Sequence, residues 1–165
     1  MVTRTAIEKM EIVKDFDLDQ LKKILELCTI ADFQQGQRLF MEGEPARDMW
    51  IVLDGSVELR FEMPDARKAT NDSTISSHNT GIPESQVFGW SCFIAPHKMR
   101  LSAYCSSRRC QVVKINADQL NKLMVSDTDI GFKIMRYLLQ VVGFRFKQMQ
   151  EEVVKFMGIN MMNSW

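Results

Sequence analysis

The sequence has no excess of either charge, because 21 Lys and Arg residues are balanced by 21 Asp and Glu residues. A protein that binds a polyanion normally carries a basic excess, so nucleic acid is not an expected partner. No apolar run approaches the roughly 18 residues that a membrane-spanning helix needs, and residues 1–14 lack the apolar core of a signal peptide. We therefore expect a soluble, cytoplasmic protein without membrane insertion.

Cysteine and histidine are also scarce, with four Cys and two His in the chain. Cys105 and Cys110 lie five residues apart, outside the usual spacing of zinc ligands, and His78 and His97 share no metal-ligand spacing. The phosphate-loop, Gly-x-Ser-x-Gly and His-Glu-x-x-His signatures are absent. These absences predict reduced thiols, no metal site, no required cofactor and no enzyme activity.

The length and composition are those of one globular domain. The chain has 165 residues, of which 45% are hydrophobic and 25% are charged, values that favour a single folded core over disorder. We expect residues 1–11 to form a lead-in, residues 12–155 to form the domain and residues 156–165 to form a C-terminal tail.

The first helix should begin after Asp17, because Asp17 is a good N-cap and Gln20 sits at the third helical position of a capping box. Four apolar residues then recur at helical spacing, which predicts a helix that ends near Ile30. They are Leu18, Leu21, Leu25 and Cys28.

Two helices are expected at the other end of the chain, a short one capped by Asn116 and a long one that begins at Asp127. Apolar residues follow at steps of three and four: Ile130, Ile134, Leu138, Val142, Phe146, Met149, Val153 and Phe156. A barrel of this size can cover only the first turns of such a helix, so its later part predicts a homodimer through the C-terminal helix.

Short strands separated by glycine turns are expected between these helices. They cover residues 38–41, 49–53, 56–61, 87–88, 101–105 and 111–115. Asp54 and Gly55 predict a tight hairpin turn, and the polar segment 63–86 predicts a mobile surface loop with a poorly paired strand inside it. This order of elements indicates an α+β fold, a β jelly-roll barrel with an N-terminal helix and two C-terminal helices.

Several motifs carry a family resemblance. They are Phe40-x-Glu42-Gly43-Glu44-Pro45-Ala46, the run Trp50 to Leu59 with Gly55 and Val57, Phe88-Gly89 followed by Ser91, Pro96, Arg100 and Ser102-Ala103, then Asn116-x-x-Gln119-Leu120, and the helix from Asp127 with Arg145. Together they resemble the cyclic-nucleotide-binding domain of catabolite activators and protein-kinase regulatory subunits. The resemblance covers about residues 12–155, and the alternative is an unrelated small β-barrel with helices.

The resemblance implies a ligand site in the phosphate-binding cassette, residues 88–103. The expected ligand-binding residues are Phe88, Gly89, Trp90, Ser91, Cys92, Arg100, Leu101 and Ser102. Main-chain N–H groups of residues 89–93 and a cation would hold the phosphate. Arg100 is the first candidate cation, His97 and Lys98 are alternatives, and a register shifted by one residue would place Leu101 there and leave Arg100 a solvated surface charge.

The cassette is atypical at Trp90. The resembling family has a Glu at this position, which accepts a hydrogen bond from the ribose hydroxyl, whereas an indole has one donor and no acceptor. Trp90 could instead stack on a base, close a pocket or fill the mouth of the barrel.

Two functions remain open from the sequence. One is a regulatory ligand-sensing module that binds cAMP or cGMP weakly at the cassette. The alternative is a degenerate cyclic-nucleotide-binding-like fold that acts as a dimerisation or docking module without nucleotide. A transcription regulator of the catabolite-activator type would need a helix-turn-helix after the long helix, and this sequence ends at Trp165.

Overall fold

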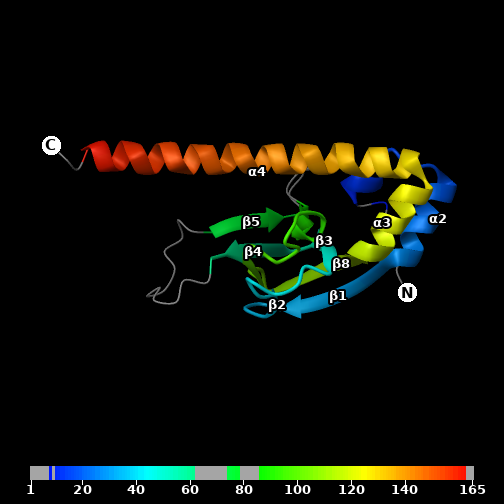
Figure 1. Ribbon diagram of the computed structural model, residues 1–165. Coiled ribbons are helices and arrows are strands. Elements are labelled where there is room, and N and C mark those ends of the chain that lie inside the picture. The colour runs from blue at the N-terminus through cyan, green and yellow to red at the C-terminus, as the bar shows by residue number, and fades with distance from the viewer. Residues whose placement is uncertain (1–7, 9, 62–73, 79–85, 163–165) are drawn as a thin grey trace.

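The computed structural model describes residues 8, 10–61, 74–78 and 86–162 of the chain. A short 3-10 helix and one α-helix precede the strands, and two α-helices follow them (Figure 1). The helical elements are η1 (Glu11–Val13), α2 (Leu18–Leu27), η4 (Trp90–Phe93), α3 (Ala117–Ser126) and α4 (Thr128–Met162). The strands are β1 (Cys28–Gln34), β2 (Arg38–Phe40), β3 (Asp48–Asp54), β4 (Ser56–Arg60), β5 (Thr74–His78), β6 (Val87–Phe88), β7 (Ser102–Cys105) and β8 (Arg109–Asn116).

The strands form two four-stranded antiparallel sheets, in the orders β1-β8-β3-β6 and β2-β7-β4-β5. Three aromatic side chains join the sheets in the core. The Phe40 ring from one sheet lies 5.5 Å from Trp50 and 5.9 Å from Phe88 of the other, measured between ring centroids. The α+β jelly roll with flanking helices, expected from the order of elements, is confirmed.

The connection at Gly55 differs from the expected hairpin. Its φ of +77° is the left-handed conformation that favours glycine, but β3 pairs with β8 and β6, whereas β4 pairs with β7 and β5. Gly55 therefore turns the chain from one sheet into the other, and the hairpin prediction is wrong. A tight turn between two apolar strands does not by itself determine whether those strands pair with each other.

Helix α2 begins as predicted and ends earlier. The Asp17 carboxylate accepts hydrogen bonds from the main-chain N–H groups of Asp19 and Gln20, both at 2.9 Å, and the capping box is complete. The helix ends at Leu27, and Cys28 begins a strand that pairs with β8 over seven residues. The expected end near Ile30 is wrong because this ladder, which sequence spacing does not show, outweighs helical continuation.

Strand β5 lies inside the segment expected to be a polar loop. All five of its residues pair with β4, from Thr74 opposite Arg60 to His78 opposite Ser56, so the strand is better paired than expected. Residues 62–73 and 79–85 lie outside the described residues, so their mobility stays a prediction. Most of the expected lead-in, residues 1–7 and 9, also lies outside them, whereas Met10 is buried in the core.

Helices α3 and α4 follow the last strand. Asn116 caps α3 as predicted, because its side chain accepts a hydrogen bond from the main-chain N–H of Gln119 at 3.1 Å. Figure 1 shows α4 running past the strands, with its C-terminal end beyond β5. None of the described helices combines the length and the apolar character needed to cross a membrane.

Candidate ligand cassette and helical interface

Gly89 is the point at which β6 ends and η4 begins. Its φ of +75° is left-handed, and a Cβ atom there would lie 2.7 Å from Cδ1 of the Trp50 indole. Both observations require glycine, because other residues are strained in this conformation and a side chain would overlap the core. Because residue 89 has no side chain, the start of the cassette packs closely against strand β3.

A cavity of about 100 Å³ lies beside this turn. Its walls are Phe40, Leu59, Gly89, Trp90, Ser91, Met99, Arg100 and Leu101. Five of the eight residues expected at the ligand site line it, namely Gly89, Trp90, Ser91, Arg100 and Leu101.

The other three expected residues belong to the core. Phe88 and Ser102 are fully buried, and the Ser102 hydroxyl accepts a hydrogen bond from the main-chain N–H of Glu42 at 2.9 Å. Cys92 is buried as well, and burial raises the pKa of its thiol to about 12. These side chains are buried next to the cassette and do not line the cavity.

Three wall residues were not expected at the ligand site: Phe40, Leu59 and Met99. Phe40 belongs to the family motif and Leu59 lies on the inward face of an alternating strand, so the sequence contained a signal for both. No sequence pattern marks Met99, which comes just before Arg100. Its main-chain groups hold the loop to the turn at Gly43, because the Gly43 N–H donates to the Met99 carbonyl at 2.8 Å.

Arg100 is the one charged side chain among the described residues that line the cavity. The two alternative cations are not among the described wall residues. His97 Nδ1 is 3.0 Å from the Cys92 carbonyl oxygen, and the main chain of Lys98 forms an isolated bridge with Pro45. In the described part of the chain, the exposed Arg100 guanidinium has no hydrogen-bond or ion-pair partner. Arg100 is therefore the available cation at this cavity.

Trp90 is half-buried, lines the cavity and packs against the edge of the core. Its position next to Gly89 puts an indole where the resemblance expects a carboxylate. The cavity is also small, since sites for drug-sized ligands usually measure about 300–1,000 Å³. The cassette geometry can therefore hold a small anionic group, and it encloses much less than a whole nucleotide.

The cassette connects to the C-terminal helices through the first residues of β3. Gly89 packs against Trp50 and close to the carbonyl of Asp48. Asp48 pairs with Asn116, the N-cap of α3, and the Ala117 N–H donates to the Arg47 carbonyl at 2.9 Å. Gly89 and the start of α3 therefore both contact the segment that begins β3.

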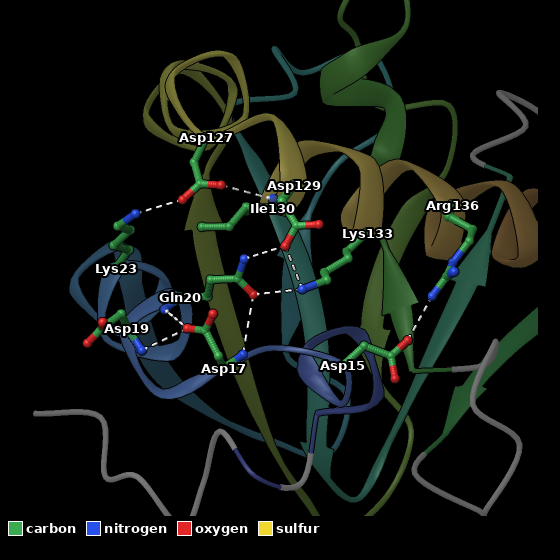
Figure 2. Close-up of polar contacts among 10 residues, drawn as sticks. All are labelled: Asp15, Asp17, Asp19, Gln20, Lys23, Asp127, Asp129, Ile130, Lys133 and Arg136. Carbon is green, nitrogen blue, oxygen red and sulfur yellow. Dashed lines mark hydrogen bonds and ion pairs between the residues drawn. The ribbon is translucent and has the colours of Figure 1, made fainter.

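A polar cluster holds α4 against the N-terminal helix, as Figure 2 shows. The buried Gln20 amide donates to the Asp129 carboxylate at 2.6 Å and accepts from the Lys133 ammonium at 2.9 Å. Gln20 and Asp129 are 109 residues apart in the sequence. The capping glutamine of α2 therefore also fixes the first turns of α4.

Two further ion pairs flank this cluster (Figure 2). The Lys23 ammonium lies 2.6 Å from the Asp127 carboxylate, and the Arg136 guanidinium lies 2.8 Å from Asp15. Hydrogen bonds from Lys23 and from Lys133 hold the pKa values of Asp127 and Asp129, respectively, below their usual range. Asp17 caps α2, whereas the neighbouring Asp15 pairs with Arg136 of α4.

Helix α4 has two apolar faces. One packs on the domain and consists of the buried Ile130, Ile134, Tyr137, Leu138 and Val141. The other is exposed and consists of Phe132, Met135, Leu139, Val142, Phe146, Met149 and Val153, which we call the α4 seam. Its members are spaced alternately by three and four residues, the repeat of a coiled coil.

The single stripe expected from the sequence mixed these two faces. Ile130, Ile134 and Leu138 lie on the domain, whereas Val142, Phe146, Met149 and Val153 lie on the seam. The side chain of Phe156 lies outside the described part of the structure. The change of face has a geometric cause, because steps of four residues drift around a helix with 3.6 residues per turn.

No group of three or more His, Cys, Asp or Glu side chains that could hold a metal ion occurs within the described residues. All four cysteines are free thiols.

Residues 30–127 match the family model of the cyclic nucleotide-binding domain. The match spans more than half of the chain, from β1 to the residue before α4, and includes the cassette. The chain belongs to the cyclic nucleotide-binding domain family, whose domains are regulatory modules. The expected resemblance is confirmed.

Solved structures show the same fold. A candidate cyclic nucleotide-binding protein from Geobacter metallireducens is 24% identical with a TM-score of 0.71, over 88% of this chain and 99% of that one. A cyclic nucleotide-binding domain from Methylobacillus flagellatus is 17% identical with a TM-score of 0.72, over 92% and 84%. The regulatory domain of Toxoplasma gondii PKA, solved with cAMP, is 17% identical with a TM-score of 0.56, over 78% and 46%. None of the curated protein sequences matches this chain.

Proposed function

We propose that this chain is a non-enzymatic, cytoplasmic regulatory module that senses a ligand at the cassette and pairs with a second copy through α4. The observation that carries the proposal is the cassette itself. Gly89 has the left-handed turn, and Arg100, which has no partner among the described residues, lines the cavity next to it. The family match supports a regulatory role of this kind.

Cyclic mononucleotides are expected to bind weakly. Arg100 can pair with the cyclic phosphate in a bidentate manner. Trp90 offers the ribose hydroxyl no acceptor, and an unsatisfied polar group costs about 1–3 kcal/mol, roughly 5–150-fold in affinity. The cavity of about 100 Å³ also leaves most of the base outside.

The proposed signal runs from the cassette to α4. Ligand at Gly89 and Arg100 would shift the start of β3, and with it the capped start of α3. The packing of α3 on α4 then biases the position of the long helix, a population shift between two helix arrangements. The polar cluster around Gln20 supplies the contacts that such a shift would strengthen or break.

The α4 seam supports the homodimer. Its seven apolar side chains extend over about six turns at 3.6 residues per turn. All of them except Val142 are more than half exposed, although they stand in a continuous row. Such a patch is uncommon on a monomer, and a second copy would cover it with the same repeat around a twofold axis.

Calorimetric titration with cAMP and cGMP tests the ligand part. We expect dissociation constants far above the micromolar range, and Arg100→Ala should weaken any binding at least tenfold, about 1.4 kcal/mol. Lys98→Ala removes a neighbouring charge outside the cavity and should leave the affinity unchanged. Submicromolar binding, or equal binding by the Arg100 variant, would contradict this assignment.

Sedimentation velocity tests the interface. The double substitution Phe146→Glu with Met149→Glu should dissociate the dimer, because it places charges inside the seam. Gln140→Glu introduces the same kind of charge on another face of α4 and should leave the dimer intact. A monomeric unmodified chain at micromolar concentration would refute the interface.

The second candidate is a dimerisation or docking module without any ligand at the cassette. The small cavity and Trp90 favour it. It predicts the same sedimentation results and no ligand response at the cassette, so the titrations separate the two functions.

A further inference from the structure

The cassette cavity is small and partly open to solvent, so its volume limits the apolar part of a ligand that can lie inside it. An apolar cavity of about 150 Å³ takes one benzene molecule, which has six carbons. By proportion, the cassette cavity of about 100 Å³ has room for an apolar body of about four carbons. A purine base or a ribose is larger than this.

The cavity walls are apolar and held in place. Phe40 and Leu59 come from strands β2 and β4, and both are buried in the core together with Met99. Leu101, immediately before β7, completes the wall. Because these side chains are packed on their other sides, the space between them is preformed, and it suits a compact aliphatic group.

The polar groups of the cavity favour a negatively charged ligand. Arg100 is exposed, and its guanidinium can bind both oxygens of a carboxylate at once. The Trp90 indole can only donate a hydrogen bond, and the Ser91 hydroxyl is the one other polar side chain among the described wall residues. The described walls hold no carboxylate, so a cationic ligand has no partner there.

We infer that the cassette cavity binds a small monocarboxylate with an aliphatic body of about four carbons, held through Arg100. The inference rests on the proposed function, because it uses the same cassette as the sensing site, and it names a different class of ligand. The aliphatic end fills the space between Phe40, Leu59 and Met99. The carboxylate lies at the rim against the guanidinium.

The test is a nuclear magnetic resonance titration of the 15N-labelled full chain with isovalerate. The reporters are the indole N–H of Trp90 and the main-chain N–H groups of Gly89, Ser91 and Leu101. Isovalerate should shift these signals in a saturable manner. The neutral isostere isovaleramide should bind at least tenfold more weakly, because it lacks the charge that Arg100 pairs with.

Matched variants locate the contact. Arg100→Gln should weaken isovalerate at least tenfold, whereas Lys98→Gln removes a charge outside the cavity and should change nothing. Ser91→Leu fills the cavity and should abolish the response while the remaining spectrum stays folded. Equal binding of acid and amide, indifference to Arg100→Gln, or shifts that never saturate would overturn the inference.

The same titration with cAMP separates this inference from the proposed function. If cAMP shifts the cassette signals and isovalerate does not, the inference of a carboxylate ligand is wrong and the proposed sensing function stands. If neither ligand shifts them, both proposals for the cassette fail, and the dimerisation module remains.

Discussion

Gly131, in the first turn of α4, lies against the main-chain carbonyl of Met124 in α3. A Cβ atom at Gly131 would be 2.7 Å from that oxygen and 3.3 Å from the Met124 Cβ. The carbonyl belongs to helical backbone and cannot move aside without disturbing α3. This contact therefore sets how closely the two C-terminal helices pack.

The contact predicts that replacing glycine by alanine has opposite effects on stability at two positions of α4. Gly131→Ala should destabilise the fold by about 1–3 kcal/mol, the usual range for overpacking. Gly143→Ala, farther along α4 where an added Cβ atom would meet nothing within 4 Å, should stabilise it by about 0.5–1 kcal/mol through helix propensity. Urea denaturation of both variants measures the difference, and equal effects would contradict the close packing.

Gly89 should be equally intolerant of a side chain. Gly89→Ala combines a left-handed φ with a contact to the buried Trp50, so we expect a loss of about 2–4 kcal/mol in unfolding free energy. Gly36→Ala is the matched control, since its φ of +79° is similar and its surroundings are open. That variant should lose only about 1 kcal/mol. If the two losses are equal, the contact with Trp50 adds nothing.

The Gln20 side chain should contribute to stability through α4. Gln20→Leu removes the amide that Asp129 and Lys133 share, while these two stay paired with each other at 2.6 Å, so we expect a loss of about 0.5–1.5 kcal/mol for each hydrogen bond removed. Lys22→Leu places the same residue on the exposed side of α2 and should change the unfolding free energy little. Hydrogen exchange should also show faster opening of the first turns of α4 in Gln20→Leu and not in Lys22→Leu. If the protection of these turns is unchanged in Gln20→Leu, the side chain stabilises only the start of α2.

The polar cluster predicts a loss of stability in acid. The folded-state pKa values of Asp127 and Asp129 are depressed by their hydrogen bonds from Lys23 and Lys133. Each carboxylate therefore contributes stability above its unfolded pKa of about 3.9, and this contribution is lost as the pH falls through the lower folded value. Unfolding free energies measured from pH 5 downward should fall less steeply for Asp129→Asn than for the unmodified chain, and an identical slope would contradict the linkage.

Much of the fold could be predicted from local sequence signals. The capping box at Asp17 and Gln20, the N-cap at Asn116 and the turn at Gly89 depend on residues within one helical turn or one loop. Their physical chemistry is local, because each side chain satisfies or frees a nearby main-chain group. The order of these elements was enough to predict a jelly roll with flanking helices.

The tertiary structure decided what depends on distant partners. Whether Gly55 makes a hairpin or a corner depends on the strands that β3 and β4 meet elsewhere. The two faces of α4 are both apolar, and only the position of the domain distinguishes Ile134, which is buried, from Phe146, which is exposed. The cavity beside Arg100 is likewise set by walls from three separate segments. Burial and cavity volume are properties of packing between remote residues. For this reason the sequence determined most of the elements of this protein, while the tertiary structure determined strand β1 through its ladder with β8 and the surfaces.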